Sequence, residues 1–127
     1  MNYILDAHAI IWLFEDSSKM SAAIKELIKQ TEIRIYISTI TLWEIALKLN
    51  IGKLTLKISF DELLSNIKNG DFEIIQIEDA YLRVLNELQF IHKDPFDRLL
   101  IASAIAEGLT IITADANIQK YDVPWIW

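Results

Sequence analysis

The sequence predicts one α/β domain, residues 1–127, in which helices cover both faces of a short, mostly parallel sheet. Short apolar strand patterns alternate with helical patterns along the chain, as in right-handed strand–helix–strand units. A length of 127 residues suits a single domain with its own core. Asp6 and Asp115 closely follow two expected strands, at the edge where α/β sheets bind ligands. Together these observations predict a three-layer sandwich with a site at the carboxyl ends of its strands.

The expected elements follow from hydrophobic periodicity and from residues that start or end helices. The expected strands are Tyr3–Leu5, Arg34–Ser38, Phe72–Ile77, Thr110–Thr113 and a short last one within Val123–Trp127. The expected helices are Ala7–Glu15, a helix capped by Ser21, a helix capped by Thr39 or Thr41 that runs to Gly52, Ser59–Asn69, Glu78–Leu88, and a helix that starts at Asp94-Pro95 and ends at Gly108. Gly52, Gly70 and Gly108 are each expected to terminate a helix.

The composition indicates a soluble, cytoplasmic protein. Hydrophobic residues make up 53% and charged residues 24% of the chain, and no segment is long and uncharged enough to span a bilayer. The N-terminal residues show no secretory signal, so we expect none. The absence of cysteine excludes a disulfide framework and a thiolate metal site.

The charge distribution argues against generic binding of polyanions. The net charge is −6, whereas nucleic-acid affinity depends largely on cations that neutralise phosphates. Lys48, Lys53 and Lys57 nevertheless lie in a stretch without an acidic residue. This stretch predicts either a basic rim beside an acidic centre or an ordinary solvated lysine face.

Four carboxylates form the candidate metal site: Asp6, Glu44, Asp97 and Asp115. A carboxylate among apolar neighbours normally has a partner, and four drawn together repel one another unless a cation lies between them. Asp6 and Asp115 each have a simpler explanation, because Asp commonly begins a turn or helix after a strand. We interpret the set as ligands of a hard divalent cation, which prefers oxygen donors.

Glu44 and Asp97 lie on helices that are otherwise largely apolar. Glu44 has Trp43 and Ile45 as neighbours and needs a positive partner, either Lys48 one turn away or a metal, and we favour the metal. Asp97 occupies the first turn of its helix, after the expected N-cap Asp94. The start of a helix itself favours negative charge, so this position also has a structural explanation. Because the helix beyond Arg98 is almost wholly apolar, we expect Asp97 to be carried inward.

The remaining polar and aromatic candidates are few. His8 and His92 are too few and too poorly placed for a zinc site or a two-histidine nuclease. We expect His8 to pack within the first helix and His92 to lie at the surface or beside the site. Trp12 and Phe14 are expected either in the core or on a protein-binding surface.

Four segments of the chain resemble the PIN-domain family, and in particular the VapC-type toxins of bacterial toxin–antitoxin pairs. They are residues 5–9 (LDAHA), 38–46 (STITLWEIA), 92–102 (HKDPFDRLLIA) and 113–115 (TAD). The third segment is highly specific, and the resemblance covers essentially the whole chain. It implies a PIN-like, Rossmann-like fold and a ribonuclease that depends on Mg²⁺ or Mn²⁺.

The resemblance also assigns roles to residues. Asp6, Glu44, Asp97 and Asp115 would form the acidic quartet, with Asp6 and Asp97 as the surest ligands. Asp94, Thr113 and Ser38 would lie beside these ligands and support them. Ala7 stands where close relatives often have Thr, which implies an altered rate rather than an inactive protein.

The implied partners are an RNA substrate, a cognate antitoxin whose tail enters the acidic groove, and a second copy of the chain in a homodimer; no membrane is expected. Three alternatives stay open at this point. One is a catalytically silent PIN-like module that binds RNA or protein, and another is a housekeeping RNA-processing nuclease. The third, a phosphatase-type or receiver-type domain, is disfavoured because Ala7 and His8 follow Asp6 and no lysine directly follows Thr113.

Overall fold

Five parallel strands form the central sheet in the computed structural model, which describes all residues 1–127. The strands are β1 (Asn2–Leu5), β2 (Arg34–Ser38), β3 (Phe72–Ile75), β4 (Thr110–Ile112) and β5 (Trp125–Ile126). Their order across the sheet is β3-β2-β1-β4-β5, and every neighbouring pair is parallel. The chain therefore fills one side of β1 first and then the other. The order reverses between β1 and β4, the position where α/β sheets open a crevice.

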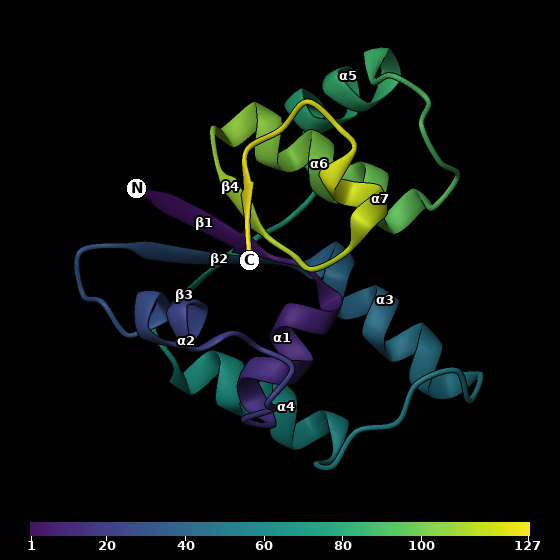
Figure 1. Cartoon of the computed structure of the whole chain (residues 1–127). Coiled ribbons are helices and arrows are strands. Elements are labelled where there is room, and N and C mark those ends of the chain that lie inside the picture. Colours follow the sequence, from purple (N-terminus) through teal and green to yellow (C-terminus); the bar gives the residue numbers. More distant parts are fainter.

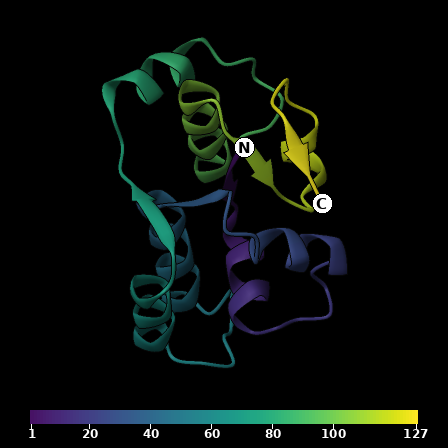
Figure 2. The same ribbon diagram turned by 90° about the vertical axis from the view of Figure 1, so that its left-hand side faces the viewer.

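Seven helices connect these strands: α1 (Ala7–Phe14), α2 (Ala22–Ile28), α3 (Thr39–Asn50), α4 (Phe60–Asn69), α5 (Asp79–Glu87), α6 (Pro95–Glu107) and α7 (Ala116–Gln119). Helices α1 to α4 lie on one side of the sheet and α5 to α7 on the other, in both views (Figures 1 and 2). The predicted α/β sandwich with helices on both faces is confirmed. None of the helices has the length and apolar character needed to cross a membrane.

Alternating side chains of the sheet build two separate cores. Tyr3 and Leu5 of β1 face the cluster that contains residues of α1 to α4, whereas Ile4 faces the cluster that contains α6. Ile4 and Leu5 have no exposed surface, so β1 is buried on both faces. This explains why the strand reads as a continuous apolar run rather than an alternating pattern.

Several predicted boundaries were wrong by a few residues. The hydroxyl of Ser38, rather than Thr39 or Thr41, caps α3 and accepts a hydrogen bond from the Ile40 amide at 3.1 Å. Strand β2 runs directly into this cap, so no linker is left in which a later threonine could act. The third strand ends at Ile75, and Thr113 lies just beyond β4 instead of within it.

Gly70 and Gly108, two of the predicted helix-ending residues, are glycine for different physical reasons. Gly108 adopts φ +67° at the end of α6, a left-handed conformation that disfavours other residues. Gly70 has φ −86° and needs no left-handed conformation. A Cβ atom there would instead lie 2.5 Å from the Phe72 ring, so close packing against that ring, rather than backbone geometry, favours glycine.

The burial of α6 gives a direct test of the core. Ile101 is fully buried, whereas Ile105, one turn further along the same helix, is 38% exposed. We expect Ile101→Ala to lower the free energy of unfolding by about 2–5 kcal/mol, because it leaves a cavity. Ile105→Ala is the control and should cost less than about 1 kcal/mol. Urea unfolding followed by circular dichroism measures both, and equal losses would contradict this placement of α6.

Candidate metal centre

Three carboxylates meet where α3 passes the start of α6. Glu44 comes from α3, Asp94 is the N-cap of α6, and Asp97 lies in the first turn of α6. One carboxylate oxygen from each residue lies within 4.8 Å of the other two. Helix α3 packs directly on α6, and this contact brings Glu44 to residues about fifty positions away in the sequence. Asp94 was expected only to support the ligands, but it belongs to this tight group.

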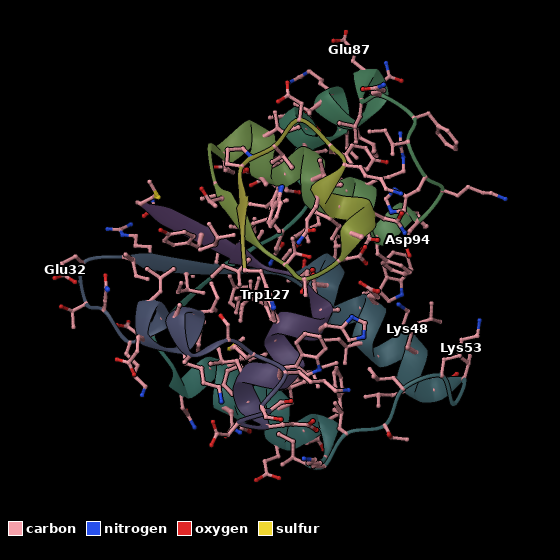
Figure 3. All side chains as sticks on the ribbon, in the orientation of Figure 1. Glu32, Lys48, Lys53, Glu87, Asp94 and Trp127 are labelled. Carbon is pink, nitrogen blue, oxygen red and sulfur yellow. The ribbon has the colours of Figure 1, made fainter.

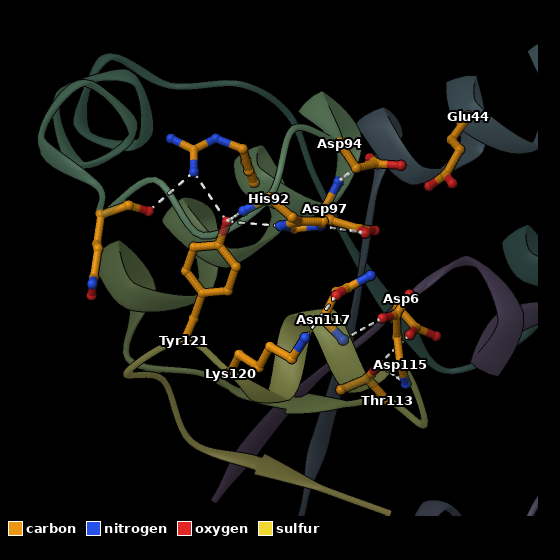
Figure 4. A network of polar contacts seen from close by, with 12 residues as sticks. Asp6, Glu44, His92, Asp94, Asp97, Thr113, Asp115, Asn117, Lys120 and Tyr121 are labelled. Atoms are coloured by element: carbon orange, nitrogen blue, oxygen red, sulfur yellow. Dashed lines mark hydrogen bonds and ion pairs between the residues drawn. The ribbon is translucent and has the colours of Figure 1, made fainter.

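Asp6 and Asp115 lie at the ends of the neighbouring strands β1 and β4. The Asp6 side chain is nearly buried and accepts hydrogen bonds from the Ala9 amide at 2.8 Å and from the Thr113 hydroxyl. Thr113 also accepts the Asp115 amide at 3.0 Å, so its hydroxyl joins the two strand ends. Figure 4 shows Asp6 and Asp115 below Asp97, with Glu44 at the upper right. The predicted quartet therefore borders one region.

Burial and mutual repulsion disfavour the charged form of two of these carboxylates. Burial raises the pKa of Asp97 to about 6; the hydrogen bond from His92 opposes this shift, and the charges of Asp94, Asp115 and Glu44 add to it. Burial also raises the pKa of Asp6 in spite of its hydrogen bonds to Thr113 and Ala9. The folded chain thus confines more negative charge here than its own groups neutralise.

Lys48 supplies the nearest positive charge. Its Nζ atom lies 2.5 Å from Oε2 of Glu44. The ion pair between Glu44 and Lys48, which the sequence made the less favoured alternative to a metal, is therefore formed. Burial lowers the pKa of Lys48, but the hydrogen bond and charge of Glu44, together with Asp94 and Asp97, outweigh this effect and raise it. Figure 3 shows Lys48 and Lys53 on the α3 side, beneath Asp94. Lys53 and Lys57 are exposed. This agrees equally with a basic rim beside the acidic centre and with an ordinary solvated lysine face.

A hydrogen-bond network that the sequence did not reveal orients Asp97. The Tyr121 hydroxyl accepts hydrogen bonds from the His92 amide at 3.2 Å and from Arg98 Nη1 at 3.0 Å. Both acceptor positions of the hydroxyl are then used, so its hydrogen points to Nδ1 of His92, 2.8 Å away. Nε2 of His92, on the other side of the ring, then donates to Oδ2 of Asp97 at 3.0 Å.

The remaining predicted residues have mixed outcomes. His92 lies beside the site, as expected, but His8 is exposed instead of packed, because α1 turns it toward the region near Asp6 and Asp115. Ser38 is buried but bonds the α3 backbone rather than a carboxylate. Trp12 and Phe14 are partly buried against the core.

The donor set fits a hard divalent cation. All candidate donors are carboxylate oxygens, the ligands preferred by Mg²⁺ and Mn²⁺. Glu44, Asp94 and Asp97, facing Asp6 and Asp115, are the residues that would hold such a cation.

Comparisons with known proteins agree with this architecture. The sequence matches the PIN domain family model over residues 3–124. The fold is similar to a chain of VapBC2 from Rickettsia felis bound to a promoter DNA fragment, with TM-score 0.75, 22% identity, and coverage of 99% of this chain and 98% of that chain. It is also similar to DNA-bound VapBC from Salmonella typhimurium, with TM-score 0.71, 16% identity, and coverage of 99% and 97%. No curated protein matches the sequence significantly. At these identities the solved structures establish the fold.

The raised pKa of Asp97 predicts that Asp97→Asn stabilises the metal-free protein at neutral pH. The Asp97 pKa rises from 3.8 to about 6 on folding, so the stability contributed by its proton is present below the lower value and lost as pH rises through the upper one. We expect the variant to exceed wild type by about 1–3 kcal/mol at pH 8, with a difference that shrinks toward pH 4. Urea unfolding in EDTA measures this; the exposed Asp79→Asn should show no such trend. A variant less stable than wild type at pH 8 would contradict the prediction.

The Tyr121 network predicts an effect on metal affinity. Tyr121→Phe removes the hydroxyl that fixes His92, and therefore loosens Asp97. We expect the dissociation constant for Mn²⁺ to rise about tenfold or more, as for other groups that orient metal ligands. Isothermal titration calorimetry measures this, with Tyr36→Phe as a matched loss of a hydroxyl. Equal affinity of both variants for Mn²⁺ would show that the network does not act on the site.

Proposed function

Because the chain belongs to the PIN domain family, whose members are nucleases, we propose that it is a divalent-metal-dependent endoribonuclease of the VapC type. The observation that carries this proposal is the convergence of Asp6, Glu44, Asp94, Asp97 and Asp115 from four separate parts of the fold. Asp97 keeps a raised pKa in this setting, which a structural ion pair would not require. A silent binding module would have no need to maintain such repulsion.

Each residue has a definite task in the proposed reaction. Asp6, Glu44, Asp97 and Asp115 would hold Mg²⁺ or Mn²⁺, with Asp94 beside them. Thr113 fixes the orientation of Asp6, and His92 fixes that of Asp97. When bound, the cation would lower the pKa of a water molecule and neutralise charge that develops on phosphate oxygens. No side-chain nucleophile is needed, which agrees with the absence of cysteine.

Lys48 links this chemistry to the substrate. Its ammonium group binds Glu44 and also lies in the field of Asp94 and Asp97. With a cation held by these carboxylates, Lys48 would be the side chain placed to contact a phosphate oxygen of the RNA. This contact would add a positive charge near the scissile bond of an otherwise acidic protein.

We further propose that the nuclease is the toxin of a toxin–antitoxin pair and acts in the cytoplasm. The fold resemblance to chains from VapBC complexes extends over 99% of this sequence. An antitoxin would block the site by inserting a basic side chain among the carboxylates, and a homodimer is the expected assembly. A housekeeping RNA-processing nuclease is the alternative, and it differs in one outcome: expression of the chain alone would leave growth unimpaired.

The test is cleavage of RNA by the purified protein. We expect cleavage with Mg²⁺ or Mn²⁺, none with EDTA, and a loss of at least about 100-fold for Asp6→Asn and for Asp97→Asn. Asparagine is also a good N-cap, so Asp6→Asn keeps the start of α1 while it removes the charge. Asp79→Asn is the control and should cleave like wild type. Wild-type rates for both site variants would refute the assignment.

A further inference from the structure

A small pocket opens between the start of α1 and the loop that joins β4 to α7. Its volume is about 160 Å³, and it is lined by Asp6, His8, Trp12, Ala114 and Asp115. Because Asp6 and Asp115 belong to the candidate metal centre, the pocket is directly continuous with it. A molecule bound at the carboxylates would therefore extend into this pocket without crossing any other part of the protein.

Two aromatic rings form one wall of the pocket. The His8 imidazole lies 5.4 Å from the Trp12 ring, with an angle of 38° between their planes. Trp12 is held from another side by Trp127, at 5.5 Å and 61°. His8 is exposed and makes no hydrogen bond within the chain, although its charge lies close enough to Asp6 to oppose the rise in the Asp6 pKa. The ring therefore lies against Trp12 and stays accessible to a ligand.

The chemistry of the pocket selects one part of a nucleotide. Its volume lies below the roughly 300–1,000 Å³ of pockets that hold drug-sized ligands, and it suits a single ring system. Without a cation, the Asp6 and Asp115 carboxylates disfavour a phosphate inside it, because like charges repel; with one, they would place the phosphate at the metal centre rather than against the rings. Aromatic side chains, in contrast, stack on the faces of all nucleobases with little dependence on sequence. An unpaired base is the component that fits.

We propose that this pocket binds the base of a nucleotide next to the phosphodiester bond that is cut, with the base stacked against His8 and Trp12. The proposal rests on the proposed nuclease function and adds to it a pocket for the base beside the bond that is cut. Stacking also supplies affinity that does not depend on positive charge. For a chain with a net charge of −6, this contribution persists at salt concentrations that weaken phosphate contacts.

The first experiment follows the two histidines of the wild-type chain by proton NMR in the presence of Mg²⁺. Adenosine 5′-monophosphate is the probe, and ribose 5-phosphate is the same molecule without the base. We expect the nucleotide to shift the His8 ring signals upfield, as stacking does, and ribose 5-phosphate to leave them nearly unchanged. Equal shifts with both probes, or no shift of His8 up to the solubility limit of the nucleotide, would overturn the proposal.

The second experiment separates stacking from charge at the same position. His8→Phe keeps a ring, His8→Lys keeps only a positive charge, and His8→Ala keeps neither. We expect affinity for adenosine 5′-monophosphate, measured by calorimetry, to be retained by His8→Phe and to fall roughly tenfold in His8→Lys and His8→Ala. Ile51→Ala, which trims an exposed side chain at the end of α3, is the control and should bind like wild type. If His8→Lys were the only one of the three variants to retain this affinity, the contact would be to the phosphate, and the proposal would be overturned.

The outcomes also separate this proposal from the nuclease assignment. Base-dependent binding at His8 without any RNA cleavage would refute the nuclease and leave a nucleotide-binding pocket. Cleavage that depends on Asp6 and Asp97, with no base-dependent effect at His8, would leave the nuclease and refute the pocket.

Discussion

Repulsion among carboxylates that the fold forces together is the constraint on which the site depends. The ends of β1 and β4 place Asp6 and Asp115 side by side, and the packing of α3 on α6 adds Glu44, Asp94 and Asp97. Burial then withdraws the water that would otherwise separate these charges, as the raised pKa of Asp97 records. Lys48, the hydrogen bond from His92 to Asp97 and the charge of His8 near Asp6 partly offset the repulsion. The arrangement is costly for an empty protein and suited to a divalent cation.

The same residues start the helices that carry the site. Asp6 caps α1, Asp94 caps α6 and Asp115 caps α7, each through a side-chain oxygen that accepts a backbone amide. Each cap fixes the orientation of its carboxylate through one oxygen. The second oxygen of Asp6 accepts the Thr113 hydroxyl, whereas those of Asp94 and Asp115 accept no hydrogen bond within the chain. One side chain can therefore serve both the start of a helix and the proposed metal. This double use explains why each aspartate, taken singly, also has a purely structural explanation.

The sequence predicted the features that depend on local chemistry. The strands, the Asp94-Pro95 helix start and the four acidic residues follow from periodicity, capping and charge, which neighbouring residues determine.

Contacts between residues far apart in the sequence were missed. Tyr121 meets His92 across 29 positions, and no local pattern marks such a pair. His8 was placed wrongly because an imidazole beside apolar residues resembles a packed one; the pitch of α1 turned it outward. The choice between Lys48 and a metal as partner of Glu44 could not be made from spacing, since both use the same face of α3.

The most direct test is the proton balance of Mn²⁺ binding, measured by isothermal titration calorimetry in two buffers with different heats of ionisation. At pH 6 about half of the Asp97 side chains carry a proton, which a cation must displace before it can bind. The account predicts release of about half a proton per Mn²⁺ or more near pH 6, and much less near pH 8. Absence of Mn²⁺ binding, or the same heat in both buffers at pH 6, would contradict a cation held by these carboxylates.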